Sequence, residues 1–332
     1  MLLVLIVHAC FLSIGKPTQD EIFMSPIPIS LRFLTESLSD ICVNIFIFIS
    51  GWFGIRSKNK RFLELIFQVW FMSIALYVIF WILGREGSWS LQRWINIFIY
   101  FNGNWFVLSY IVLYIISPLL NSFAENTPRS RFKDLLIAFF VAQTIFGFIY
   151  NTNFFSYGYS PLSFIGLYLL ARYIRLYPNR WTVKSKWFDI GMYLCTSFLT
   201  MLCAMTYTIT TGKTDRLFYA YTSPLIIIGA IYFFLCFSKI KFQSKSVNWV
   251  ASSAFAVFLL HTDPIFFMPY YLGPIRRWFY GETLAMFIVN TSVRILCVFV
   301  IAIFIDKIRI AVWNFICSVG SKIQSGGTIK SQ

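Results

Sequence analysis

The chain contains few charged residues. Only 12% of its 332 residues are Asp, Glu, Lys or Arg, whereas soluble domains carry about 25%. Hydrophobic residues make up 58% of the chain and aromatic residues 20%. A water-soluble core cannot bury so large an apolar fraction, so the composition excludes an ordinary soluble domain. It indicates an integral membrane protein surrounded by the lipid bilayer.

Several signatures of soluble enzymes and of nucleic-acid binding are also missing. The sequence has no Walker loop, dinucleotide fingerprint, Gly-x-Ser-x-Gly motif or metal-ligand spacing, and its seven cysteines show no paired spacing. ATP-driven transport and serine hydrolysis are therefore unsupported, and no metal is expected. The net charge of +15 comes from short basic runs between apolar stretches, so no nucleic-acid partner is expected either.

Long apolar stretches are the main positive feature. A spanning helix needs about 20 mainly apolar residues, which predicts an all-α, polytopic transmembrane bundle of about ten helices. The expected helices lie near residues 1–14, 38–55, 63–84, 105–123, 133–151, 160–177, 188–209, 219–238, 247–268 and 283–305. We expect residues 1–317 to form one integral membrane domain and residues 318–332 a flexible cytoplasmic tail.

Lys and Arg alternate between the two sets of loops that these helices define. Nineteen lie in one set and eight in the other, and Arg294 lies within the last helix. Because cytoplasmic loops retain positive charge, the set with nineteen is predicted to be cytoplasmic, together with both termini. We expect a multi-pass membrane protein with both termini in the cytoplasm.

The first apolar stretch is short. Fourteen residues span about 21 Å as an α-helix, against a hydrocarbon core of about 30 Å. No basic region precedes it and no small-residue cleavage site follows it, which disfavours a signal peptide. We therefore expect a first helix that is truncated on its cytoplasmic side.

The two histidines of the chain, His8 and His261, both fall within predicted membrane helices, in the outer half of the bilayer. Ionisable groups are costly there, so each is a candidate for function. A neutral imidazole suits proton abstraction near neutral pH, although hydrogen bonding between helices is the alternative for both. Asp263 lies two residues after His261 and orients an imidazole if the chain unwinds before Pro264.

Polar side chains also share helix faces elsewhere. Arg294 lies near the middle of the last helix with Asn290 one turn before it, and Asp40 and Asn44 share a face of the second. A guanidinium within the membrane lines a polar cavity or pairs with a carboxylate, such as Asp40 or Asp263. Both possibilities stay open for Arg294.

Two groups of cations on the predicted cytoplasmic side could bind phosphates of a soluble donor. The same cations also obey the positive-inside rule, so their sequence pattern does not separate ligand binding from topology. They are Arg56, Lys58, Lys60 and Arg61 in one group and Arg172 and Arg175 in the other.

Six short strings together resemble the acyltransferase family 3 of membrane O-acyltransferases, specifically bacterial members with no attached extracellular esterase-like domain. They occur in family order through nearly the whole chain. They are Val4-Leu5-Ile6-Val7-His8, Phe46-Ile47-Phe48-Ile49-Ser50-Gly51-Trp52-Phe53, Asn104-Trp105-Phe106-Val107-Leu108, Leu169-Leu170-Ala171-Arg172-Tyr173-Ile174-Arg175, Tyr221-Thr222-Ser223-Pro224-Leu225 and Phe258-Leu259-Leu260-His261-Thr262-Asp263-Pro264.

The resemblance implies transfer of an acyl group, usually acetyl, from cytoplasmic acyl-CoA to a hydroxyl of a cell-surface polysaccharide or glycolipid. It implies that His8 is the catalytic base. The family's basic partner of that histidine lies eleven residues earlier, a position that would precede Met1. An already activated thioester needs chiefly deprotonation of the hydroxyl, stabilisation of an oxyanion and alignment. Arg294 and the helix-start amides near Trp105 are the candidates for the oxyanion.

A membrane transporter or flippase for a glycan lipid is the competing interpretation, in which the same polar residues line a pathway. A structural subunit without a site is a third. Many transporters contain inverted repeats, and the sequence shows no internal repeat by inspection. That favours the enzyme.

The charge alternation generates a topological prediction. A reporter that is active only outside the cytoplasm should give signal when fused after Gly212 and none when fused after Lys241, because these positions lie in loops of opposite charge. Enzymatic assay of whole cells measures this directly. The reverse pattern would invert the orientation of every predicted helix.

Overall fold

The computed structural model describes residues 1–85 and 90–327. These residues form helices and no β-strand, so the prediction of an all-α polytopic bundle is confirmed. The chain divides into two compact units. Unit one comprises Met1–Ser57, Gly103–Phe242 and Leu272–Phe287, and unit two comprises Lys58–Asn102, Gln243–Tyr271 and Ile288–Gln332.

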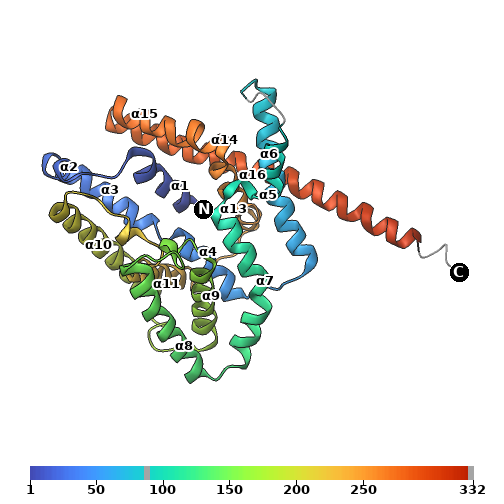
Figure 1. The fold of residues 1–332 in the computed structure, drawn as a ribbon, viewed down its shortest axis with the longest axis horizontal. Helices are drawn as coiled ribbons and strands as arrows, with labels where there is room; N and C mark the ends of the chain where they lie inside the picture. Colours follow the sequence, from blue (N-terminus) through green and yellow to red (C-terminus); the bar gives the residue numbers. More distant parts are fainter. Residues whose placement is uncertain (86–89, 328–332) are drawn as a thin grey trace. The chain divides into compact units, whose positions relative to one another are not determined.

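Unit one contains most of the helices labelled in Figure 1. They are α1 (Leu2–Val7), η1 (His8–Leu12), α2 (Gln19–Met24), α3 (Pro26–Ser39), α4 (Cys42–Phe53), α7 (Trp105–Asn126), α8 (Arg129–Ala142), η3 (Gln143–Ile149), η4 (Ser156–Gly158), α9 (Pro161–Leu176), α10 (Lys186–Thr211), η5 (Leu217–Tyr219), α11 (Pro224–Ser238) and α15 (Gly273–Gly281). Within this unit, α10 packs against α11 and α3, and α4 packs against α9 and α11.

Unit two is built around α5, which packs against α6, α13 and α14. Its helices are α5 (Asn59–Ile82), α6 (Leu91–Phe98), η2 (Phe101–Gly103), α12 (Lys245–Ala251), α13 (Ala254–Thr262), α14 (Pro264–Phe266), η6 (Phe267–Leu272) and α16 (Leu284–Gly327). The last residue of η2, the last residue of η6 and the first turn of α16 are assigned to unit one. The helix α16 includes the first part of the predicted flexible tail, residues 318–327, and the rest of that tail lies outside the described residues.

Seven helices of the described chain are long and apolar enough to cross a membrane, or eight if one bent pair is a single span, compared with the ten expected. The seven are Pro26–Phe53, Asn59–Ile82, Trp105–Asn126, Arg129–Ile149, Lys186–Thr211, Leu217–Ser238 and Leu284–Val319. The bent pair, Lys245–Thr262 and Pro264–Gly281, turns by 57° where Asp263 is extended before a proline. The two other expected helices are shorter, at Leu2–Leu12 and Pro161–Leu176.

The second span begins twelve residues earlier than expected. Pro26 and Pro28 lie in the first turn of α3, where no intrahelical N–H partner is required. Arg32 is consequently part of a helix and not of an outer loop. Its Nη2 donates to the carbonyl of Gly15 at 2.6 Å, and its guanidinium lies 5.0 Å from the centre of the Phe279 ring.

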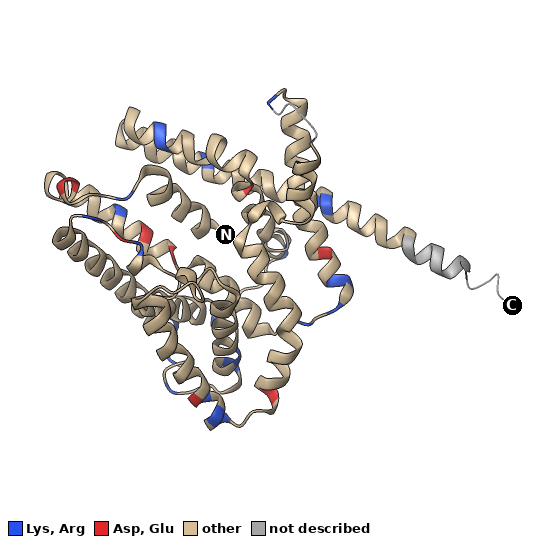
Figure 2. Ribbon diagram, in the orientation of Figure 1, with Lys and Arg blue, Asp and Glu red and all other residues tan. Residues whose placement is uncertain are grey.

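Contacts between loops of unit one agree with the predicted alternation. On the side expected to face outward, Thr18 pairs with Lys213 and the Tyr280 hydroxyl donates to the carbonyl of Ile14. On the other side, Arg175 donates to the carbonyl of Trp52, and Tyr177 donates to that of Thr127. Charged residues lie mostly at helix ends and in loops (Figure 2), as the membrane requires.

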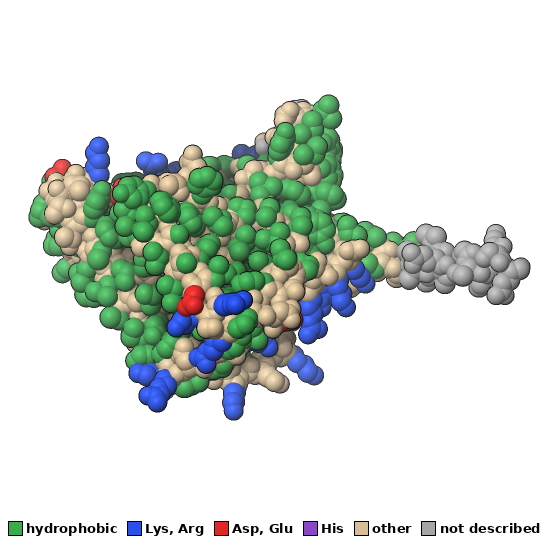
Figure 3. All heavy atoms as spheres, turned by 60° about the horizontal axis from the view of Figure 1, so that its bottom comes forward, with side chains coloured by type: hydrophobic (Ala, Val, Ile, Leu, Met, Phe, Trp, Pro, Cys, Tyr) green, Lys and Arg blue, Asp and Glu red, His purple; other side chains and the backbone are tan. Residues whose placement is uncertain are grey.

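Hydrophobic side chains cover most of the face shown in Figure 3. Many large apolar residues are exposed along the spanning helices, among them Leu119 on α7, Phe198 on α10 and Phe304 on α16. Such a surface would be a liability in water but matches lipid chains. The chain is therefore a multi-pass membrane protein.

A glycine allows α4 and α9 to approach closely. A Cβ atom on Gly51 would lie 2.5 Å from the backbone oxygen of Tyr168 and 2.8 Å from Cβ of Ala171. Association of helices in lipid depends on this kind of close packing. Gly51 therefore permits the close approach of these two helices.

Gly51→Ala should lower the midpoint of thermal unfolding in detergent, because the added methyl group forces α4 away from α9 at a cost of about 1–3 kcal/mol. The matched control is Gly191→Ala on α10, where an added Cβ meets nothing within 4 Å of the described structure. That variant should unfold at the parental temperature or slightly above it, since Ala favours helix over Gly. Equal effects of the two substitutions would disprove the packing argument.

Candidate active site

His8 lies where the first helix changes geometry. It ends α1, and residues His8–Leu12 form the π-helical turn η1 with non-helical backbone angles at Cys10 (φ −91°, ψ −110°). Such turns frequently mark functional sites, because they interrupt the regular hydrogen-bond ladder. His8 is half-buried, so its side chain keeps some access to its surroundings.

The break after His8 is held by Glu36 of α3. The Glu36 carboxylate accepts a hydrogen bond from the backbone N–H of Phe11 at 3.2 Å, and the Cys10 thiol donates to the carbonyl of Arg32 at 3.5 Å. A backbone N–H without a partner would be costly in a membrane. The carboxylate therefore stabilises a backbone shape that a regular helix does not have.

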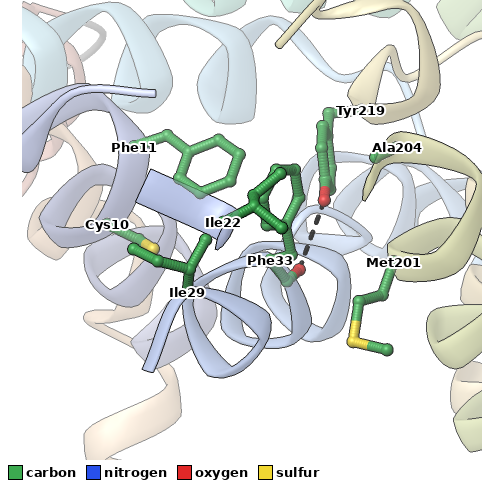
Figure 4. Packing of buried hydrophobic residues seen from close by; sticks show 8 residues of the cluster. All are labelled: Cys10, Phe11, Ile22, Ile29, Phe33, Met201, Ala204 and Tyr219. Carbon is green, nitrogen blue, oxygen red and sulfur yellow. Dashed lines mark hydrogen bonds between the residues drawn. The ribbon is translucent and has the colours of Figure 1, made fainter. Parts of the chain in front are cut away.

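Aromatic packing fixes the same turn from the other side. The Phe11 ring lies edge-on to Phe33 and to Tyr219, with ring centres 5.4 Å apart in both pairs. Figure 4 shows these residues together with Cys10 and Ile29, and its dashed line is the hydrogen bond from the Tyr219 hydroxyl to the Phe33 carbonyl at 3.3 Å. The backbone two to three residues after His8 is thus anchored by buried groups.

Asp40 and Asn44 lie one turn apart at the junction of α3 and α4, as the sequence predicted for residues sharing a face. Both are buried, at 3% and 0% exposure. The Asn44 amide donates to the backbone oxygen of Tyr221 at 3.1 Å. The positive charge of Arg216 is close enough to interact electrostatically with Asp40 and Glu36.

Trp105 opens α7 beside a group of aromatic rings. The Asn104 side chain caps the helix by accepting from the backbone N–H of Val107. The amide of Trp105 is one of the first-turn donors that have no intrahelical acceptor, which fits the expected role as an oxyanion donor. Its indole lies 4.2 Å from the Tyr159 ring centre and 6.1 Å from that of Tyr221.

His261 belongs to unit two and is fully buried. Its Nδ1 lies 2.7 Å from the backbone oxygen of Val257. A carbonyl only accepts, so the neutral ring carries its proton on Nδ1 and its lone pair on Nε2. Three aromatic rings, those of Phe258, Phe267 and Tyr271, surround the imidazole edge-on at 5.5–6.1 Å.

Asp263 stands at the predicted break, where the chain does unwind before Pro264. One carboxylate oxygen accepts from the backbone N–H of Ile265 at 3.1 Å, and the other accepts from the Asn102 amide at 3.0 Å. The side chain therefore caps the following helix and ties it to Asn102. Both of its oxygens accept from groups other than the His261 imidazole.

Arg294 and Asn290 are half-buried on α16. The guanidinium is close enough to the Tyr271 hydroxyl for an electrostatic interaction, and the Tyr271 ring contacts His261. Within unit two the structure thus brings Arg294, Tyr271 and His261 into one neighbourhood. The sequence singled out the first and the last of these but not the tyrosine between them.

Arg172 and Arg175 meet at the end of α4. Arg172 is 8% exposed and forms an ion pair with Glu125 at 3.0 Å, and Gly54 lies against its guanidinium. Arg175 is exposed and donates to the carbonyl of Trp52, over whose ring it lies at 5.7 Å. The two side chains therefore stabilise the α4 C-terminus, whatever else they bind.

The other group of cations predicted to be cytoplasmic surrounds the start of α5. All four side chains are exposed, and Lys58 is the N-cap residue. Arg56 is assigned to unit one and the remaining three to unit two: Lys58, Lys60 and Arg61.

Glu36 is the polar residue of this region that sequence reasoning missed. It precedes Asp40 by one helical turn, so the two carboxylates share a face of α3. The sequence does contain a signal for Glu36, because an acidic residue inside an apolar span is a candidate for function by default. Placing the helix start too late put Glu36 in a loop and hid it.

Comparison with known proteins gives one match. A family model described as "Acyltransferase domain" matches residues 1–305 of the chain. Curated proteins and solved structures give no match.

Proposed function

Since the chain belongs to this acyltransferase family, we propose that it is a membrane O-acyltransferase that moves an acyl group, most simply acetyl, from cytoplasmic acyl-CoA to a hydroxyl of a cell-surface polysaccharide or glycolipid. The family match over residues 1–305 carries the proposal and favours an enzyme over a flippase. The multi-pass fold and its apolar surface agree with a site inside the bilayer, which we assign to the bacterial cytoplasmic membrane.

The reaction needs little activation of the donor, because a thioester is already reactive. The base removes the proton of the acceptor hydroxyl while the oxygen of that hydroxyl attacks the carbonyl carbon of the thioester. The resulting oxyanion collapses, the carbon–sulfur bond breaks, and the proton passes to the departing thiolate. The products are the ester and free coenzyme A.

We assign the role of base to His8. The half-buried imidazole at the π-helical turn has access to a substrate, whereas His261 is completely enclosed. Glu36 and the Phe11 amide hold the turn in one shape, which supports a fixed position for the imidazole. The Trp105 helix start in the same unit supplies donors for the oxyanion.

His261, Asp263 and Arg294 form the second candidate set, in unit two. The tautomer of His261 is fixed by Val257, so Nε2 is able to accept a proton. Arg294 is the candidate for stabilising negative charge there, and Asp263 holds the helix break.

Phosphates of coenzyme A would meet cations on the cytoplasmic side. Arg175 and the exposed group Arg56, Lys58, Lys60 and Arg61 are available for such contacts. Arg172 has its ion pair with exposed Glu125, which a phosphate is able to replace.

His8→Ala should reduce glycan acylation by about 10²–10⁴-fold, the usual contribution of a general base. Mass spectrometry of surface glycans from cells expressing parent or variant measures the ester content. His261→Ala is the matched comparison and should be milder. Membrane levels of all three proteins need to be equal.

If the parent is active and His8→Ala acylates glycans equally well, His8 is not the base. Loss in His261→Ala alone would exchange the two roles and keep the enzyme. A parent that adds no acyl group to any envelope glycan would contradict the proposed function.

Replacing Arg172 and Arg175 together by Gln should raise the apparent KM for acetyl-CoA more than it lowers kcat, because phosphate contacts in the ground state act as uniform binding. The control is Arg180→Gln with Lys184→Gln, exposed cations of the following loop. Thermal unfolding must be measured in parallel, since both arginines also hold α4. An unchanged KM in a stable variant would make these residues structural only.

A further inference from the structure

Two buried oxygen atoms at the α3–α4 junction lack a donor. Asp40 Oδ2 and Asn44 Oδ1 accept no hydrogen bond from any group in residues 1–85 and 90–327. The side chains are 3% and 0% exposed. A buried acceptor left without a donor costs about 1–3 kcal/mol. An ionised carboxylate oxygen and an amide oxygen accept only, so a group that pairs with them in that state must bring O–H or N–H donors.

An aromatic wall adjoins these atoms. The Asn44 amide is bonded to the backbone of Tyr221, whose ring lies nearly parallel to the Trp105 indole, at 25° and 6.1 Å. The Tyr159 ring lies 4.2 Å from the same indole. Trp105 and Tyr159 are half-buried, so the cluster is not closed on every side.

A cation completes the cluster. The Arg216 guanidinium lies 4.7 Å from the centre of the Tyr159 ring and interacts electrostatically with Asp40 and Tyr221. Arg216 belongs to the loop after α10, which the charge pattern places on the outer side of the membrane. The half-exposed edge of the cluster thus faces the compartment that contains surface glycans.

We propose that Asp40, Asn44, Trp105, Tyr159, Tyr221 and Arg216 form the subsite for the sugar ring of the acceptor, an inference that rests on the proposed function. A pyranose ring has an apolar C–H face that fits an indole or phenol ring, and hydroxyls that donate to carboxylate and amide oxygens. A guanidinium donates to hydroxyl and ring oxygens. These three chemistries occur together here.

The position agrees with the assigned base. Tyr221 follows Tyr219 by two residues, and the Tyr219 ring contacts Phe11, three residues after His8. Subsite and imidazole belong to the same compact unit. Water would also satisfy the two buried oxygens, and it is the alternative that the experiment must exclude.

Direct binding tests the subsite independently of catalysis. The purified full-length protein is immobilised in detergent and titrated with tritium-labelled glycolipid and polysaccharide extracted from cells lacking the gene. Asp40→Asn, which replaces an accepting oxygen by a donating NH2 group, should weaken retention about tenfold, as should Arg216→Gln. Trp105→Ala should weaken it more than Trp105→Phe.

Trp187→Ala and Arg180→Gln are the controls, because both residues are exposed and lie outside the cluster. They should retain the label as the parent does. If Trp105→Ala fails to fold, the glycan binding of Arg216→Gln still tests the subsite, because Arg216 lies in a loop. A parent that retains no label, or cluster variants that bind like the controls, would overturn the subsite and leave water as the occupant.

Transfer of acetyl groups from acetyl-CoA, measured on the same samples, separates this inference from the proposed function. Transfer by the parent together with unaltered glycan binding in all cluster variants refutes the subsite only. Binding that depends on the cluster, with no acetylated product formed by the parent, supports the subsite and refutes the acyltransferase reaction.

Discussion

The structure depends on one constraint, which is that lipid supplies no hydrogen bonds to the backbone. Regular helices satisfy it along most of the chain. Where a helix is broken, a side chain must take over, and Glu36 does so for the Phe11 amide while Asp263 does so for the Ile265 amide. Glu36 and Asp263 are thus first of all partners of interrupted backbone.

The same interruptions create the chemistry. A helix that continued without a break through Cys10 would align His8 with a regular ladder and leave Glu36 without a backbone donor. The π-helical turn instead carries His8 and the Cys10 thiol, and its Phe11 amide donates to the Glu36 carboxylate 25 residues further along the chain. In an environment of low polarity such groups interact more strongly than in water. The proposed acyl transfer needs mainly a positioned base and a donor for the oxyanion.

Close packing is the second support of the site. Gly51 lets α4 approach α9, Arg175 then holds the α4 C-terminus, and the neighbouring Arg172 pairs with Glu125 of α7. At its other end, α4 begins directly after Asp40 and carries Asn44. One helix therefore connects the cations proposed for the donor with the buried oxygens proposed for the acceptor.

Sequence alone determined the membrane class, the all-α fold, most of the spans and the family, because these depend on hydropathy, charge alternation and short motifs that are local in the chain. It placed the start of the second span too late, because it followed the apolar stretch alone, and so it missed Glu36. Tertiary structure decided which polar groups meet: the partners of Asp263, the fixed tautomer of His261, and the junction of Asp40 and Asn44 with Tyr221 and Arg216. These contacts join residues up to 177 positions apart, and no local pattern encodes the packing that brings them together.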